Sequence, residues 1–184
     1  MPKFSGGGHS TVFFWDVEDC PVPDGLTAEA VWRNMRMALA NNGEYLGRCE
    51  ITGFGDYSLA TKHAGIGMMC SPLGDRRTRQ SKILVEFLCR AIRSPSQTKF
   101  VLILGDISGH SGIKMPDLRR LFEFELAAHL MRCLNFTVFL AQPQNASQQL
   151  LKAVPTKWLW SSLSAARNAE LALNAKLLNG SSLK

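Results

Sequence analysis

Two long apolar runs, each ending on an aspartate, constrain the fold of this chain more than any other feature of its sequence. The first covers residues 11–15 and stops at Asp16, and the second covers residues 100–105 and stops at Asp106. Neither run alternates with polar residues, which is typical of strands buried on both faces of a parallel sheet. Ligands of such sheets bind beyond the carboxyl ends of the strands. If these strands are neighbours, a cation between the two carboxylates would offset their burial and repulsion.

The rest of the chain alternates between strand-like and helix-like segments. Further strands are expected at residues 45–54, 68–71, 136–141 and 156–160, and helices at 27–41, 59–64, 83–91, 117–134 and 146–153. Residues 72–79 and 107–116 are rich in glycine, proline or charge, and we expect loops there. This alternation predicts an α/β fold, a three-layer sandwich with a central, mostly parallel sheet and right-handed crossovers.

Size and charge indicate one domain with a polyanionic partner. The chain has 184 residues, 46% of them hydrophobic, and a formal net charge of +6. An excess of this size favours nucleic acid but also fits a protein that is merely soluble. Five scattered cysteines without a C-x-x-C pair are typical of reduced thiols. No apolar stretch reaches the roughly 18 residues of a membrane span, so we expect no membrane insertion and an intracellular protein, with residues 1–10 a flexible lead-in.

An acidic group follows the first apolar run. Asp16, Glu18 and Asp19 lie where the first strand should open onto the sheet edge. Carboxylate oxygens are the ligands that Mg²⁺ and Mn²⁺ prefer, and such ions activate water near phosphate groups. The alternative is a helix-capping or solvated acidic turn. Asp106, on an independent strand with the same ending, moves the interpretation toward a metal site.

Basic and aromatic side chains supply the other candidates for nucleic-acid contact. The basic group precedes and begins the helix at 83–91, and it consists of Arg76, Arg77, Arg79 and Lys82. It could neutralise RNA phosphates, or it could be a solvated loop with no partner. Trp158 and Trp160 alternate along the last strand, and core packing is the favoured interpretation over base stacking.

Several ordered blocks resemble a known family. They are VFFWDVEDCPVPDGL, ITGFGD, SKILVEFL, FVLILGD, FTVFLAQP and TKWLWSSLSA, spread over residues 11–166. Together they resemble the plant NYN domains of the limkain, or meiosis regulator and mRNA stability factor, type. NYN domains belong to the PIN-like nuclease group, so the resemblance implies a three-layer α/β domain over residues 11–163, with a peripheral tail at 164–184. It also implies binding of single-stranded RNA, regulation of gene expression and, often, metal-dependent endoribonuclease activity.

The chain departs from the family pattern at its acids. The family's D-x-E-N becomes Asp16-Val17-Glu18-Asp19, and Gln80 stands where the family has a central acid. The family then has S-G-D-R-D-F. Without a gap its second acid aligns with Ser108, whereas an insertion at residues 107–121 aligns it with Glu123.

The resemblance implies phosphodiester hydrolysis with one or two Mg²⁺ or Mn²⁺ ions. Asp16 and Asp106 would be direct ligands, and Asp19 and Glu123 would be outer or second-site carboxylates. A catalytically inactive RNA-binding module, whose affinity survives chelation, is the alternative. A third possibility is an α/β phosphatase with Asp16 as nucleophile and Glu18 as the second acid. We expect a cytoplasmic protein, and an association with peroxisomes rests on the family resemblance alone.

Overall fold

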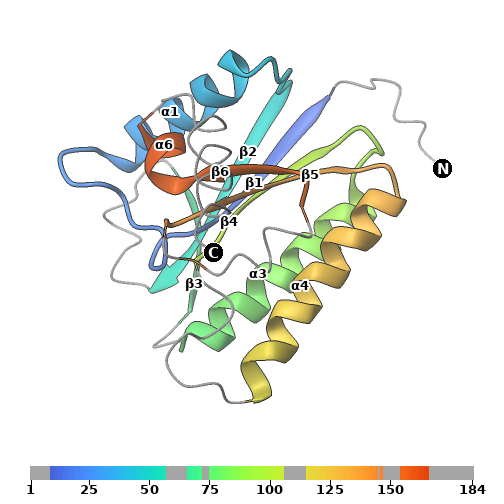
Figure 1. The fold of residues 1–184 in the computed structure, drawn as a ribbon. Coiled ribbons are helices and arrows are strands. Elements are labelled where there is room, and N and C mark those ends of the chain that lie inside the picture. Colours follow the sequence, from blue (N-terminus) through green and yellow to red (C-terminus); the bar gives the residue numbers. More distant parts are fainter. Residues whose placement is uncertain are drawn as a thin grey trace, which may run out of the picture.

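The computed structural model describes residues 9–56, 66–71, 75–105, 115–144, 146 and 154–165. Its elements follow one another as β1 Ser10–Asp16, α1 Ala28–Asn41, β2 Arg48–Asp56, β3 Gly67–Ser71, α3 Arg76–Arg93, β4 Lys99–Ile103, α4 Met115–Cys133, β5 Thr137–Gln142, β6 Thr156–Leu159 and α6 Trp160–Ser164 (Figure 1). The helix expected at 59–64 lies outside the described residues, as does nearly all of the helix expected at 146–153.

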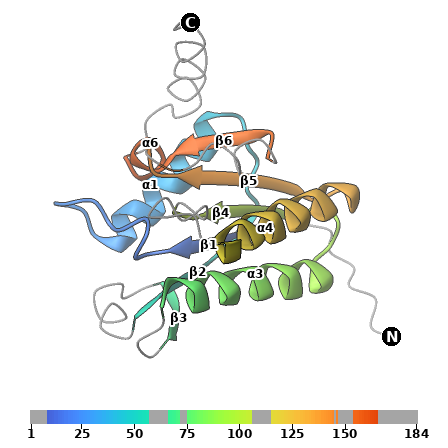
Figure 2. The ribbon, with the colours of Figure 1, turned by 60° about the horizontal axis from the view of Figure 1, so that its bottom comes forward.

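The strands form one parallel sheet in the order β3-β2-β1-β4-β5-β6. Helices α3 and α4 lie on one face, and α1 and α6 lie on the other (Figure 2). The predicted three-layer α/β fold is therefore confirmed. The chain builds outward from β1 in one direction and from β4 in the other. The carboxyl ends of β1 and β4 thus flank the position where the strand order reverses, which is the usual ligand position in open α/β sheets.

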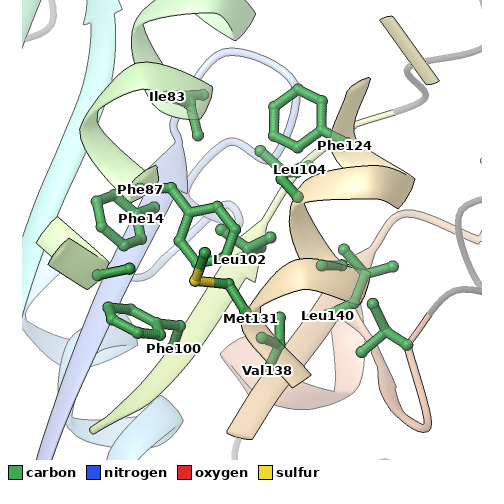
Figure 3. Close-up of a cluster of buried hydrophobic side chains, with 14 of the residues drawn as sticks. Phe14, Ile83, Phe87, Phe100, Leu102, Leu104, Phe124, Met131, Val138 and Leu140 are labelled. Carbon is green, nitrogen blue, oxygen red and sulfur yellow. The ribbon is translucent and has the colours of Figure 1, made fainter. Parts of the chain in front are cut away.

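Aromatic side chains fill the layer between the sheet and the helices α3 and α4 (Figure 3). Phe14 and Phe100 point into this layer from adjacent strands, and Phe87 of α3 packs edge-on against Phe100 with ring centroids 5.3 Å apart. Phe124 and Met131 of α4 complete the cluster. Burial of each such side chain contributes about 1.5–3 kcal/mol, so this layer fixes α3 against the sheet.

The opposite face holds the tryptophans. Trp15 and Trp160 pack with ring centroids 5.3 Å apart, and Trp158 lies against Phe139 at 5.0 Å. Trp15, Trp158 and Trp160 are three of the four tryptophans of the chain, and all three are buried on the face of the sheet that α1 and α6 cover. The prediction that Trp158 and Trp160 are core residues is confirmed, although Trp160 begins α6 instead of ending the strand.

Two sequence-based boundaries are wrong. Helix α3 begins at Arg76, whereas a loop was expected through Arg79. Asp75 caps it by accepting a hydrogen bond from the Thr78 backbone N–H at 2.7 Å, and the inward positions of its first turns carry the polar residues Arg79 and Gln80, which hide the helical period. Strand β2 begins at Arg48, later than expected, because Gly43 and Gly47 adopt positive φ values of 81° and 59° and lengthen the turn after α1.

Candidate functional site

The three acids after β1 are gathered by a tight turn. Oδ1 of Asp16, the last residue of β1, accepts hydrogen bonds from the backbone N–H groups of Glu18 at 3.2 Å and Asp19 at 3.1 Å. The Cys20 N–H donates to the Asp16 carbonyl at 3.0 Å. The Trp15 indole N–H in turn donates to the Cys20 carbonyl at 2.7 Å. The turn is therefore fixed from the buried core, and it holds its carboxylates at the carboxyl edge of the sheet.

Arg79 of α3 reaches into these carboxylates. Its Nε lies 2.8 Å from Asp16 Oδ1, one terminal nitrogen lies 3.1 Å from Asp19 Oδ1, and the other pairs with Glu18. The side chains of Arg79 and Asp16 are 4% and 1% exposed. Arg76, one turn earlier, places its Nε 2.7 Å from Asp19 Oδ2. We call these five residues, Asp16, Glu18, Asp19, Arg76 and Arg79, the arginine-acid cluster.

Burial and charge act against each other inside the cluster. Burial raises the pKa of Asp16 to about 6, and the Asp19 carboxylate adds to this shift while Arg79 opposes it. Burial alone would lower the pKa of Arg79, but the carboxylates of Asp16, Asp19 and Glu18 outweigh it and raise that pKa. Arg79 is therefore a permanent cation, and Asp16 is its most easily protonated neighbour.

Cys20 is a poor nucleophile in this setting. Burial, with the nearby charges of Asp16 and Asp19, raises the pKa of its thiol well above the usual value. Neighbouring negative charges and burial both disfavour the thiolate, which is the reactive form of cysteine. Among the residues that the structure describes, Cys20, Cys49, Cys89 and Cys133 are free thiols.

The end of β4 lies directly against the acidic turn. A Cβ atom added to Gly105 would stand 2.6 Å from Asp19 Cγ, closer than real atoms approach. Gln142, at the end of β5, donates from Nε2 to the Gly105 carbonyl at 3.1 Å. The strand ends therefore meet at one edge, as the two apolar runs predicted.

Two buried side-chain oxygens at this edge lack a hydrogen-bond partner among the described residues. Asp16 Oδ2 has no partner among the residues that the structure describes, although Asp16 Oδ1 accepts three donors. Gln142 Oε1 is likewise buried without a partner within the described part of the chain. Such groups are rare in native proteins and mark places where a proton, a water molecule or a ligand can bind.

The structure places the predicted metal ligands unevenly. Asp16 and Asp19 lie together, and Glu18 joins them through Arg79. Asp106 follows Gly105 directly but lies outside the described residues, as does Ser108. Glu123 lies half-buried on α4, next to the core residue Phe124. Gln80 is 5% exposed and supplies no charge.

The carboxylates as arranged do not fit a divalent ion. Mg²⁺ takes about six oxygen ligands at about 2.1 Å, whereas Asp16 Oδ1 already accepts three donors and Arg79 holds the other two acids. The described residues contain no group of three or more His, Cys, Asp or Glu side chains arranged to hold a metal ion. The cations that face these acids are Arg79, which contacts all three, and Arg76, which pairs with Asp19.

The predicted basic group is divided by the fold. Arg79 is turned inward, Arg76 is 44% exposed while bonded to Asp19, Arg77 is exposed, and Lys82 is half-buried.

The burial of Asp16 gives no support to the phosphatase alternative. A phosphatase nucleophile must reach its substrate, and the Asp16 side chain is only 1% exposed. Sequence reasoning missed the inward role of Arg79. The sequence pattern that could have predicted this role is the pair Arg76 and Arg79. They are three positions apart and therefore share one face of a helix, and the three acids after the first strand need a cation.

The fold and the cluster define an α/β protein whose six-stranded parallel sheet carries, at its carboxyl edge, an arginine-acid cluster built around the buried pair Asp16 and Arg79. No family model matches the chain, and no curated protein matches it significantly. The resemblance to NYN domains therefore stays a prediction from the sequence blocks. Within the part of the chain that the structure describes, no helix is long and apolar enough to cross a membrane.

Proposed function

We propose that this protein binds single-stranded RNA and does so without a divalent metal. The observation that carries the proposal is the pairing of Arg79 with Asp16, Glu18 and Asp19. Arg79, together with Arg76 on Asp19, offsets most of the negative charge of acids that would otherwise repel phosphates at the edge where such sheets bind ligands. The NYN-like blocks and the net charge of +6 support RNA as the polyanion.

The phosphate contacts of this proposal come from the start of α3. Arg77 is exposed there, Lys82 follows within two turns, and Arg76 exposes nearly half of its side chain while bonded to Asp19. These cations lie beside the carboxyl edge because α3 packs on the sheet with Arg79 facing the end of β1. A phosphate backbone along this edge would meet their positive charges.

A binding assay in two conditions tests the proposal. Fluorescence anisotropy of a labelled single-stranded RNA should give the same Kd with Mn²⁺ and with EDTA. The variant R77E should weaken binding, whereas R93E, the same charge reversal at the far end of α3, should leave it unchanged. Binding that vanishes in EDTA, or that responds equally to both substitutions, would refute metal-independent recognition at this edge.

A metal-dependent ribonuclease is the second candidate. Because the acids as arranged do not fit a metal, this function requires Arg79 to withdraw from them. Two observations favour it: Asp16 Oδ2 has no hydrogen-bond partner in the described part of the chain, and Gly105, just after β4, lies against Asp19. In this case the protein cleaves labelled RNA with Mn²⁺, and D16N and D106N each abolish cleavage. RNA binding without cleavage in the wild type would leave the binding module as the function.

A further inference from the structure

The arginine-acid cluster resembles a metal site in which the guanidinium of Arg79 takes the place of the metal ion. Three carboxylates surround one guanidinium, and each of its three nitrogens faces a different acid. The guanidinium is a rigid planar fork that matches carboxylate geometry. Its burial shows that the position belongs to the folded interior and is not a chance contact of surface side chains.

We infer that Arg79 is an internal substitute for a divalent cation, and that its removal turns the cluster into a site for a hard divalent ion such as Mn²⁺ or Mg²⁺. Without Arg79, three carboxylates face one another, and Arg76 is the remaining cation of the cluster. A divalent ion then satisfies the net negative charge better than sodium or water can, because carboxylate oxygens are its preferred ligands.

A second observation also points to a ligand position. Asp16 is fully buried, and its Oδ2 has no hydrogen-bond partner in the described part of the chain, while backbone N–H groups fix the carboxylate through Oδ1. Loss of Arg79 frees the Nε contact on Oδ1 as well. The result is a fixed carboxylate with an unused oxygen beside Glu18 and Asp19, together with the volume that the guanidinium vacates.

The inference concerns metal binding and does not depend on RNA binding. Isothermal titration of the full chain with Mn²⁺ tests it. The wild type should give no saturable heat, whereas R79A should bind one Mn²⁺ per chain, at least tenfold more tightly than the weakest binding that the titration of the wild type would detect. The double variant D16N/R79A should lose most of this gain. R93A, which removes an exposed arginine from the other end of the same helix, should behave as the wild type.

Folding of the variant is measured in parallel. If R79A is unfolded without metal, addition of Mn²⁺ should restore its circular dichroism spectrum, and failure to restore it overturns the inference. R79K keeps a positive charge without the fork and should bind Mn²⁺ more weakly than R79A. Wild-type protein that binds Mn²⁺ as tightly as R79A, or a folded R79A that does not bind, also overturns it.

Discussion

At the scale of single residues, Asp16 combines a fixed position with an unfavourable charge. Burial is the largest cause of its raised pKa, followed by the negative charge of Asp19, and Arg79 offsets these effects only in part. Arg79 must serve Glu18 and Asp19 at the same time. A neutral side chain of the same shape at this position, such as asparagine, would therefore stabilise the folded state at neutral pH.

The first prediction follows from this shift. The pKa of Asp16 is about 6 in the folded protein, whereas an unperturbed aspartate has a pKa of 3.8. Between these pH values the folded state binds a proton that the unfolded state lacks, so the stability present below 3.8 is lost as the pH rises toward 6. The loss amounts to about 3 kcal/mol at most.

Urea unfolding of the wild type and of D16N over this pH range measures the effect. Asparagine cannot ionise, so the stability of D16N relative to the wild type should rise with pH. The charges of Arg76 and Arg79 are common to both proteins and largely cancel in the difference. A difference that stays constant, or that falls as the pH rises, would show that Asp16 is ionised throughout.

Gly105 supports a second prediction. In G105A the new methyl group collides with Asp19, whose Cγ would be 2.6 Å away. Overpacking of this kind costs about 1–3 kcal/mol, and the shift of Asp19 should also weaken its pairing with Arg76. The matched control is G67A, because a Cβ at Gly67 meets its nearest atom at 3.5 Å. Equal unfolding midpoints for the two variants would contradict the tight contact.

At the scale of elements, helix α3 joins the core to the site. Its residues Ile83, Phe87 and Ala91 face the sheet, and the same face continues toward the amino end as Arg79 and Gln80. The apolar part of the helix therefore sets the position of the guanidinium. Rotation of the helix by one residue would move Arg79 away from Asp16, since successive helical residues differ by about 100° in direction.

A third prediction tests this coupling. F87A removes a buried ring that packs on Phe14 and Phe100, and it should lower the free energy of unfolding by about 3–5 kcal/mol. V85A, two residues earlier on the same helix, changes a side chain that is 58% exposed and should cost less than about 0.5 kcal/mol. Guanidinium unfolding measures both values. Similar losses would mean that α3 is not held by this layer.

The elements that the sequence predicted well are those with strong, uninterrupted patterns. Strands β1, β4 and β5 appeared as unbroken apolar runs because both of their faces are buried. Helix α1 was predicted at 27–41, and in the structure it begins at Ala28 with Thr27 as its cap, accepting a hydrogen bond from the Ala30 N–H at 3.1 Å. The start of α3 was missed because a buried arginine and a buried glutamine break the hydrophobic period.

The site was predictable in its acids and not in their counterion. Because parallel strands end at one edge, the acids that follow β1 could be placed near Gly105 from the sequence alone. The choice between a metal and an arginine depends on which way the first turns of α3 face, and that orientation is set by long-range packing of Phe87 and Ile83. A basic segment gives no local sign that one of its members is buried.

At the scale of the whole molecule, the strand order makes the carboxyl edge the meeting point of distant segments. The β1 turn, the start of α3, and the ends of β4 and β5 all contribute groups there. Arg79 is buried in the cluster and Arg76 is bonded to Asp19, whereas the exposed Arg77 and the half-buried Lys82 lie outside the cluster. RNA affinity should then depend on a small number of phosphate contacts and on salt.

The last prediction concerns this salt dependence. Each cation that contacts a phosphate of single-stranded RNA adds about 0.7 to the slope of log Kobs against log salt, because binding releases counterions. K82A and R77A should each reduce the slope by about that amount, whereas R93A, at the opposite end of α3, should leave it unchanged. Anisotropy titrations between about 50 and 200 mM salt cover the range in which such contacts change affinity most clearly. R79A should change the slope little, since its guanidinium is buried among carboxylates. A loss of slope in R79A as large as in R77A would place Arg79 on the RNA and would mean that the cluster opens when RNA binds.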